Sequence, residues 1–214
     1  MREILLSIAV AAISYLLGCF STGLMIADKS GVNLREVGSK STGASNVLRV
    51  MGLKKGLITF LGDFLKALLA CWIGSLLLPA ATFGIPGFGM MLGGLCATLG
   101  HNWPVFYGFK GGKGVACSVA ILLFVNPLWG GLSIAICVAI IALTRFISLG
   151  SLSMLLSFMI FMCIAFWGQW FLCLWTLTLF LLCAYRHRAN IQRLLNGTEN
   201  KIGQKTKPTN QPPA

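Results

Sequence analysis

The stretch ILLSIAVAAISYLLGCFSTGLMIA, residues 4–27, contains no Asp, Glu, Lys or Arg. An apolar run of about 20 residues is long enough to cross the hydrocarbon core of a bilayer as a helix. The run is also longer than the apolar region of a secretory signal peptide, and it lacks a clear small-x-small cleavage site. The stretch therefore predicts a transmembrane helix rather than a signal that is removed.

Similar apolar runs recur along the chain. Of its 214 residues, 57% are hydrophobic and only 10% are charged, against roughly 25% charged residues in a soluble domain. The runs predict spans at residues 4–27, 57–80, 85–107, 112–126, 128–144, 151–167 and 169–185. The sequence thus predicts an all-α, polytopic membrane protein of about seven transmembrane helices. We expect residues 1–195 to form one transmembrane helical domain and residues 196–214 a polar cytoplasmic tail, disordered toward its end.

Positive charge is distributed unevenly over the connecting segments. Fifteen of the 17 Lys and Arg residues lie in alternate segments: six in 28–56, two in 108–114, Arg145, and six after residue 185. The connections between these segments carry no charge. Because cytoplasmic loops are enriched in Lys and Arg, the pattern places the N-terminus outside and the C-terminus in the cytoplasm.

Few residues suit a metal or a cofactor. The eight cysteines are scattered singly through the apolar runs, which predicts neither a zinc site nor a disulfide framework. Asp63 is the only acidic residue within a predicted span, so we expect no catalytic metal and no cofactor. The basic charge follows the membrane topology, and we expect no nucleic-acid partner.

The first polar cluster is Gly38–Arg49, which reads GSKSTGASNVLR. Its small residues let a ligand approach the backbone, Ser39 and Asn46 offer hydrogen bonds, and Arg49 offers a bidentate fork for a phosphate. Ala44 and Ser45 stand where a P-loop has Lys and Ser/Thr, which argues against a nucleotide-hydrolysing loop. The alternative is a solvated Gly/Ser linker.

The second cluster, Gly100–Val115, contains Gly111-Gly112-Lys113-Gly114. A Gly-Gly-Lys-Gly turn that opens a helix would present free N–H groups, the positive end of the helix and an ammonium to one anion. The alternative is a flexible connector with anchoring lysines. For His101, at the start of this cluster, a structural role in the loop is favoured.

The third cluster follows the last predicted span. If the helix continues, His187 and Asn190 share a face at i, i+3 spacing. The arginines of this cluster, Arg186, Arg188 and Arg193, are interpreted as juxtamembrane anchors for anionic lipid. Within the second span, the i, i+3 spacing of Asp63 and Lys66 predicts an ion pair facing the bundle, with either a structural or a site-supporting role.

Together these motifs resemble the acyl-phosphate-dependent glycerol-3-phosphate acyltransferases of bacteria, the PlsY family. The resemblance extends to about Gly203 and is carried by six ordered motifs: Gly38–Arg49, Asp63 with Lys66, Gly100–Val115, Ser148–Ser151, His187 with Asn190, and Gly197–Lys201. The chain departs from the family at Lys40-Ser41, where Gly-Asn is usual. This departure puts the path of that loop in question.

The resemblance implies an active site at the cytoplasmic face of a bacterial inner membrane. With the cluster analysis, it makes the catalytic candidates His187, Asn190, Lys113 and Ser39. The candidates for substrate binding are Arg49, Asn46, Gly111, Gly112, Gly114, Ser148 and Ser151.

The expected reaction is transfer of a fatty acyl group from acyl phosphate to the sn-1 hydroxyl of glycerol 3-phosphate, giving lysophosphatidate and inorganic phosphate. The residues five beyond His101 and His187 are Phe106 and Gln192, so the HxxxxD pair of coenzyme-A-dependent enzymes is absent. The basic surface also permits docking of the enzyme that makes the acyl phosphate.

Two other functions compete with this one. A transporter of organic phosphates would place polar residues near the midplane and usually carry an internal repeat. A lipid-binding scaffold would need the basic residues alone, without the small and amide residues beside them.

Overall fold

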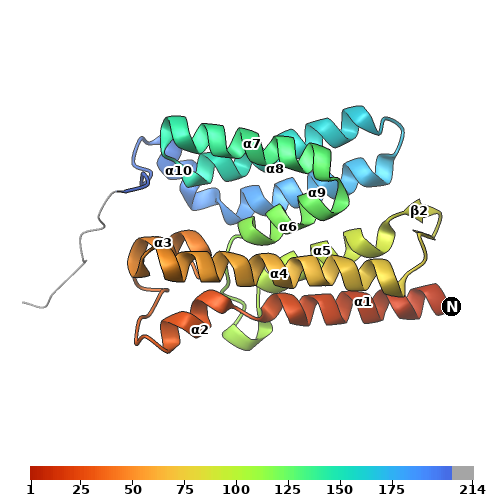
Figure 1. Cartoon of the computed structure of the whole chain (residues 1–214), viewed down its shortest axis with the longest axis horizontal. Helices are drawn as coiled ribbons and strands as arrows, with labels where there is room; N and C mark the ends of the chain where they lie inside the picture. Colours follow the sequence, from red (N-terminus) through yellow and green to blue (C-terminus); the bar gives the residue numbers. More distant parts are fainter. Residues whose placement is uncertain (204–214) are drawn as a thin grey trace, which may run out of the picture.

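The computed structural model describes residues 1–203, and these are mostly helical (Figure 1). The helices and strands, in chain order, are α1 Arg2–Cys19, α2 Thr22–Asp28, α3 Ala44–Met51, α4 Leu53–Leu77, β1 Ala81–Thr82, β2 Ile85–Pro86, α5 Phe88–Asn102, the 3₁₀ helix η1 Val105–Tyr107, α6 Val115–Val125, α7 Pro127–Thr144, α8 Ile147–Ala165, α9 Trp170–Arg186 and α10 Arg188–Leu195. The predicted all-α class is thus confirmed, apart from a two-stranded turn at residues 81–86 that the sequence did not suggest. The part of the predicted disordered tail beyond residue 203 lies outside the described residues.

Each predicted span contains a helix, but the helices differ in length. By length and composition, four of the helical segments in residues 1–203 can cross a membrane, or five if α9 and α10 count as one bent span. At a rise of about 1.5 Å per residue, α6 extends only about 16 Å, roughly half of the hydrocarbon core. The expected count of seven spans is therefore not confirmed, and α6 is too short to cross alone.

The helices form two groups that run in nearly the same direction (Figure 1). One contains α1, α4 and α5, and the other contains α7, α8 and α9, with α6 between them. Helices α4 and α5 approach closely at Gly89 and Gly93, where the absence of side chains allows the backbones to pack together. A Cβ at Gly93 would collide with the Ala70 carbonyl oxygen, so no other residue fits there.

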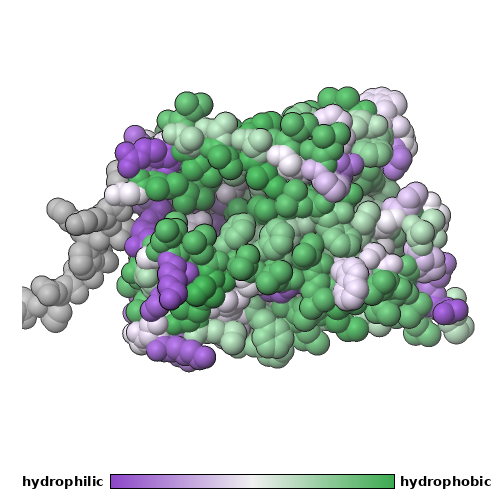
Figure 2. Space-filling view, in the orientation of Figure 1, coloured by the Kyte–Doolittle hydropathy of each residue, from purple (hydrophilic) through white to green (hydrophobic). Residues whose placement is uncertain are grey.

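The face shown in Figure 2 is largely apolar over both groups of helices. Along α4, for example, Leu57, Leu61 and Leu65 recur at i, i+4 spacing and are each more than half exposed. A soluble protein does not leave such a stripe uncovered, whereas a lipid-facing helix does. Phe158, Leu179 and Trp175 are buried in the core between the helices. The indole N–H of Trp175 donates to the Met91 carbonyl at 3.0 Å.

Two interruptions of the helices position polar groups. Helix α1 ends at Cys19, and the Ser21 hydroxyl accepts a hydrogen bond from Leu24 N to begin α2, which leaves the Phe20 carbonyl without a helical partner. Helices α9 and α10 meet at His187 with a bend of 66°, so the expected continuous helix is broken there. Helices α3 and α10 lie at one end of the molecule, opposite the N-terminus (Figure 1).

Candidate active site

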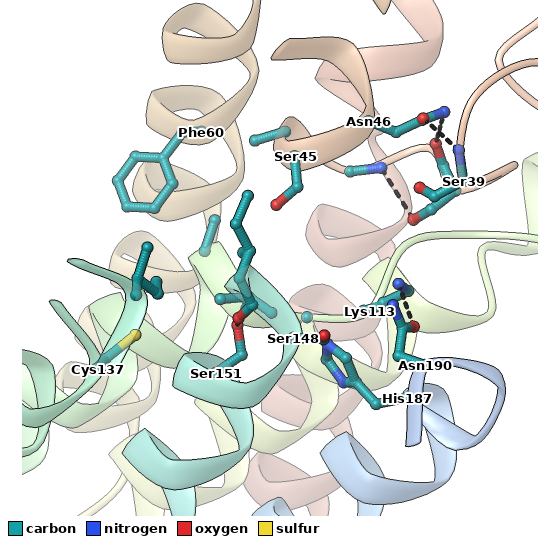
Figure 3. Close-up of a pocket in the computed structure, with 18 of the residues that line it drawn as sticks. Ser39, Ser45, Asn46, Phe60, Lys113, Cys137, Ser148, Ser151, His187 and Asn190 are labelled. Carbon is teal, nitrogen blue, oxygen red and sulfur yellow. Dashed lines mark hydrogen bonds between the residues drawn. The ribbon is translucent and has the colours of Figure 1, made fainter. Parts of the chain in front are cut away.

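A cavity of about 380 Å³ lies between the two groups of helices, near α3 and α10. One part of its wall is polar and charged, and contains Arg49, Lys113, Ser148, His187, Asn190 and Glu199. The other part is apolar and contains Phe60, Val119, Ile134, Val138 and Ile141. Figure 3 shows the division: Lys113, Asn190, His187 and Ser148 converge on one side, while Phe60 and Cys137 lie on the other.

The segment before α3 is held in place by Asn46. This side chain is 1% exposed, and its Nδ2 donates to the carbonyls of Leu34, Val37 and Ser41, while its Oδ1 accepts from Ser39 N at 2.7 Å. The amide of Asn46 is thus engaged by the loop itself. Asn46 lines the cavity together with Ser39, and these hydrogen bonds indicate that it supports the loop that carries Ser39.

Lys40, where the family usually has Gly, adopts an unusual backbone conformation. Lys40 has a φ of 56°, in the left-handed region that glycine adopts with little strain. The loop therefore takes the turn that a glycine would favour, with lysine in its place at some conformational cost.

The turn at Gly111–Gly114, called the glycine loop below, is held by hydrogen bonds on two sides. Gly111 N and Gly112 N donate to the carbonyls of Asn102 and His101 at 3.2 and 3.0 Å, which satisfies the last carbonyls of α5. Arg186 donates to the Gly112 and Gly111 carbonyls, each at 2.9 Å. Both amides thus have protein acceptors, and the prediction that they bind an anion stays a prediction. Neither glycine lines the cavity, whereas Gly114, at the start of α6, does.

Lys113 leaves this loop and enters a hydrogen-bonded chain. Its Nζ donates to Asn190 Oδ1 at 2.6 Å, and Asn190 Nδ2 donates to Glu199 Oε1 at 2.6 Å. The same carboxylate oxygen accepts from Ser148 Oγ at 2.9 Å, and Arg193 Nε binds Oε2 at 2.8 Å. Four segments of the chain are joined through one carboxylate.

Charges in the polar wall perturb one another. Burial lowers the pKa of Lys113 to about 8, with Arg193 and Arg49 acting in the same direction and Glu199 opposing them. Burial also lowers the pKa of Arg49. Burial alone would raise the pKa of Glu199, but hydrogen bonds from Asn190, Ser148 and Arg193 outweigh it and lower the pKa. Within residues 1–203, no hydrogen bond or ion pair engages the Arg49 guanidinium, which leaves a cation available to an anion.

His187 occupies the corner between α9 and α10 and is 2% exposed. Its Nδ1 lies 2.9 Å from the Cys183 carbonyl oxygen. Since a carbonyl can only accept, this contact assigns the proton to Nδ1 in the neutral ring and leaves a lone pair on Nε2. Ser151, the other predicted serine, lines the cavity while its hydroxyl donates to the Ile147 carbonyl.

Comparison with known proteins identifies the family. The family profile described as "Glycerol-3-phosphate acyltransferase" matches residues 8–197. The chain belongs to this glycerol-3-phosphate acyltransferase family.

Two curated glycerol-3-phosphate acyltransferases illustrate the likeness. The protein of Thermoanaerobacter sp. (strain X514) is 40% identical over 201 residues, covering 94% of this chain and 98% of its own. The protein of Clostridioides difficile (strain 630) is 41% identical over 208 residues, with 95% and 98% covered.

Solved structures agree. The crystal structure of PlsY, an integral membrane glycerol 3-phosphate acyltransferase, in its glycerol 3-phosphate form has a TM-score of 0.83 and 36% identity, covering 92% of this chain and 96% of that one. Its lysophosphatidic acid form has a TM-score of 0.80 and 35% identity, with 92% and 95% covered. The predicted resemblance to the PlsY family is confirmed, and the chain is an acyltransferase. This result favours the predicted enzyme over the two competing alternatives, a transporter and a non-catalytic scaffold.

Sequence reasoning missed Glu199 as a member of this acyltransferase's site. In the sequence, Glu199 is marked only by its place in the Gly197–Lys201 motif, within a polar segment typical of a tail. Its side chain is 5% exposed and joins Asn190, Ser148 and Arg193. An acidic residue among so many basic ones was the available signal.

Two arginines of the acyltransferase also have roles other than the expected one. Arg186 clamps the glycine loop and packs over the Trp103 ring at 5.1 Å, and Arg193 pairs with Glu199. Of the three arginines interpreted as lipid anchors, only the exposed Arg188 has no contact with the polar wall or its glycine loop among the described residues.

No group of three or more His, Cys, Asp or Glu within residues 1–203 is arranged to hold a metal ion. The expectation of a metal-free and cofactor-free reaction in this acyltransferase stays a prediction.

Proposed function

We propose that the enzyme transfers a fatty acyl group from acyl phosphate to the sn-1 hydroxyl of glycerol 3-phosphate, in the cytoplasmic membrane of a bacterium. The observation that carries the proposal is the divided cavity, in which a cationic wall meets an apolar wall. Both substrates carry a phosphate, and one of them also carries a long apolar chain. A site for the pair needs both kinds of wall in contact.

The cations of the polar wall suit two phosphate groups. Lys113, beside the first turn of α6, would hold one phosphate, and Arg49 with Ser39 would hold the other. Gly114 keeps the wall open beside Lys113, since it lines the cavity without a side chain. Which phosphate belongs to which substrate is left open by this arrangement.

The chemistry requires little beyond positioning and charge neutralisation. The sn-1 oxygen attacks the acyl carbonyl carbon, the bond from that carbon to the phosphate oxygen breaks, and inorganic phosphate departs with the electron pair. The hydroxyl proton passes either to His187 Nε2, which has a lone pair in the assigned tautomer, or to a substrate phosphate oxygen. Phosphate is a good leaving group, so no strong acid is needed.

The remaining site residues would position these groups. Asn190 and Glu199 fix the Lys113 ammonium, while Ser148 and Ser151 lie where the polar and apolar walls meet. The apolar wall would hold the acyl chain. Val138 belongs to this wall and is 60% exposed on the lipid-facing surface, which supports entry of the chain from the bilayer. The polar wall would then face the cytoplasm, where the enzyme that makes acyl phosphate can dock.

The test uses the purified full-length protein in detergent or a lipid mesophase. Supplied with glycerol 3-phosphate and palmitoyl phosphate, it should release inorganic phosphate and form 1-acyl lysophosphatidate in equal amounts. Palmitoyl coenzyme A should give no product. Acylation from the coenzyme A donor at a comparable rate, or acylation at the sn-2 position, would contradict the proposal.

A further inference from the structure

A buried cluster of ionisable side chains lies beside the glycine loop, apart from the residues assigned to the reaction above. Asp63 and Lys66 belong to α4, His101 belongs to the last turn of α5, and each is less than a tenth exposed. The Lys66 ammonium pairs with Asp63 Oδ1 at 2.8 Å and donates to the Phe20 carbonyl at 2.5 Å. It also lies 3.1 Å from Nδ1 of His101. The predicted Asp63–Lys66 ion pair is confirmed, and His101 joins it.

This arrangement determines where the imidazole of His101 carries its hydrogen. A lysine ammonium only donates, so Nδ1 must accept from it, and the proton of the neutral ring sits on Nε2. A second proton would enter at Nδ1, which faces Asp63 Oδ1 at 3.5 Å. In both protonation states, Nε2 is an N–H donor.

The Nε2 edge of His101 faces the glycine loop. A Cβ on Gly112 would collide with Nε2, so the loop passes directly across this edge. None of the hydrogen bonds formed among residues 1–203 uses this N–H. His101 nevertheless lines the cavity together with Lys113 and Gly114. The Nε2–H of His101, held in place by Asp63 and Lys66, thus lies at the cavity beside the glycine loop. It has no protein acceptor in the described part of the chain.

We propose that His101 donates a hydrogen bond from Nε2 to an oxygen of the phosphorylated substrate that Lys113 binds. Asp63 and Lys66 act as positioning residues that hold the ring and its tautomer. This role replaces the structural one favoured for His101 from its sequence context. The inference rests on the proposed function, because its ligand is a phosphate of the acyl-transfer substrates.

A matched pair of substitutions separates ligand binding from a purely structural role. The amide nitrogen of Gln reaches the position of Nε2, whereas the side chain of Asn reaches only that of Nδ1. We expect His101→Gln to lose only a few-fold in kcat/KM for glycerol 3-phosphate or palmitoyl phosphate, and His101→Asn to lose roughly 10–100-fold, as for removal of a hydrogen bond to a charged group. A role limited to satisfying Lys66 would give the reverse order, and that result would overturn the proposal.

A second measurement does not depend on the stability of the variants. The chain has only two histidines, so full-length wild-type protein labelled with ¹⁵N-histidine in micelles gives two assignable imidazoles. Saturating glycerol 3-phosphate, or inorganic phosphate in a parallel titration, should shift the Nε2–H proton of His101 downfield. Binding is measured separately by calorimetry. Binding heat from both ligands without a shift at His101 overturns this inference alone, whereas the absence of binding by either ligand contradicts the proposed function.

Discussion

The two walls of the cavity are built in different ways. The polar wall is cross-linked: Glu199 alone joins the segments that carry Ser148, Asn190 and Arg193. The apolar wall contains side chains such as Ile134 and Val138, which touch their neighbours only by packing. Directional contacts fix atoms to within tenths of an ångström, whereas packing fixes a shape. The polar wall should therefore control turnover, and the apolar wall should control only how well a chain is held.

The largest effect should come from Lys113→Ala. Loss of the buried ammonium removes the principal cation of the polar wall and should lower kcat/KM by about 10³-fold, as for removal of a preorganised charge-stabilising group. Phosphate release measured with the purified protein checks this. The exposed Lys110 of the same loop is the matched control, and Lys110→Ala should retain activity. Full activity in Lys113→Ala would remove this lysine from the site.

His187→Ala should come next. If Nε2 accepts the hydroxyl proton, kcat should fall by about 10²-fold or more with little change in KM. The exposed neighbouring Arg188, changed to Ala, serves as the control for disturbance of the helix corner. A loss confined to KM would instead assign His187 to binding and leave the proton to a substrate phosphate.

Glu199→Ala tests the cross-linking of the polar wall. Asn190 and Ser148 would lose their common acceptor and Arg193 its counter-ion, which should lower kcat/KM by roughly tenfold and reduce thermal stability. The exposed Glu36, changed to Ala, provides a comparison of equal charge change. Equal behaviour of the two variants would show that the carboxylate does not organise the wall.

The charge on Lys113 predicts a pH dependence. Its pKa of about 8 means that the ammonium is present below that pH and is lost as the pH rises through it. A phosphate dianion binds the charged form, so kcat/KM for the free enzyme should fall several-fold by about pH 8.5. In Lys113→Arg the guanidinium stays charged, and the alkaline limb should move to higher pH. If the alkaline limb of kcat/KM stays in place in Lys113→Arg, the titration of another group causes it.

The smallest effect should come from the apolar wall. Ile134→Ala removes packing surface for the acyl chain. If the chain loses burial equal to one methylene group, worth about 0.8 kcal/mol, KM for palmitoyl phosphate should rise about fourfold with no change in kcat. Butyryl phosphate, too short to reach the wall fully, should be affected less. Leu143→Ala, on the lipid-exposed side of the same helix at 85% exposure, is the control. A large fall in kcat would break the contrast between the walls.

The two walls also differ in how far the sequence revealed them. Apolar runs without charge fix the long helices, because such runs have no alternative to a helix in a bilayer. The same signal predicts a membrane span at α6 although the helix is too short to cross. The apolar run of α6 continues across the break at Asn126-Pro127 into α7, and this continuity hides the end of the helix. Lys113, His187 and Asn190 were identified by residue type and spacing, and the structure brings them to one cavity.

What sequence could not supply were partners chosen by the fold. The amides of Gly111 and Gly112 are free in any local reading of the loop, and only the return of the chain to the end of α5 occupies them. Glu199 likewise has no significance until α10 turns it toward Ser148, 51 positions earlier in the chain. Contacts between distant segments leave no periodic signal in the sequence.

The segment that carries Glu199 is tied to the α7–α8 turn, where Ile202 N donates to the Arg145 carbonyl at 2.9 Å and the Arg145 guanidinium donates to the Ile202 carbonyl at 2.6 Å. A nascent polypeptide synthesised only as far as Leu195 has all of its long helices but neither this tie nor the carboxylate. The long helices are thus complete in the sequence before the segment that cross-links the polar wall begins. A chain that ends at Leu195 should therefore keep its long helices but acylate more slowly than the full-length protein.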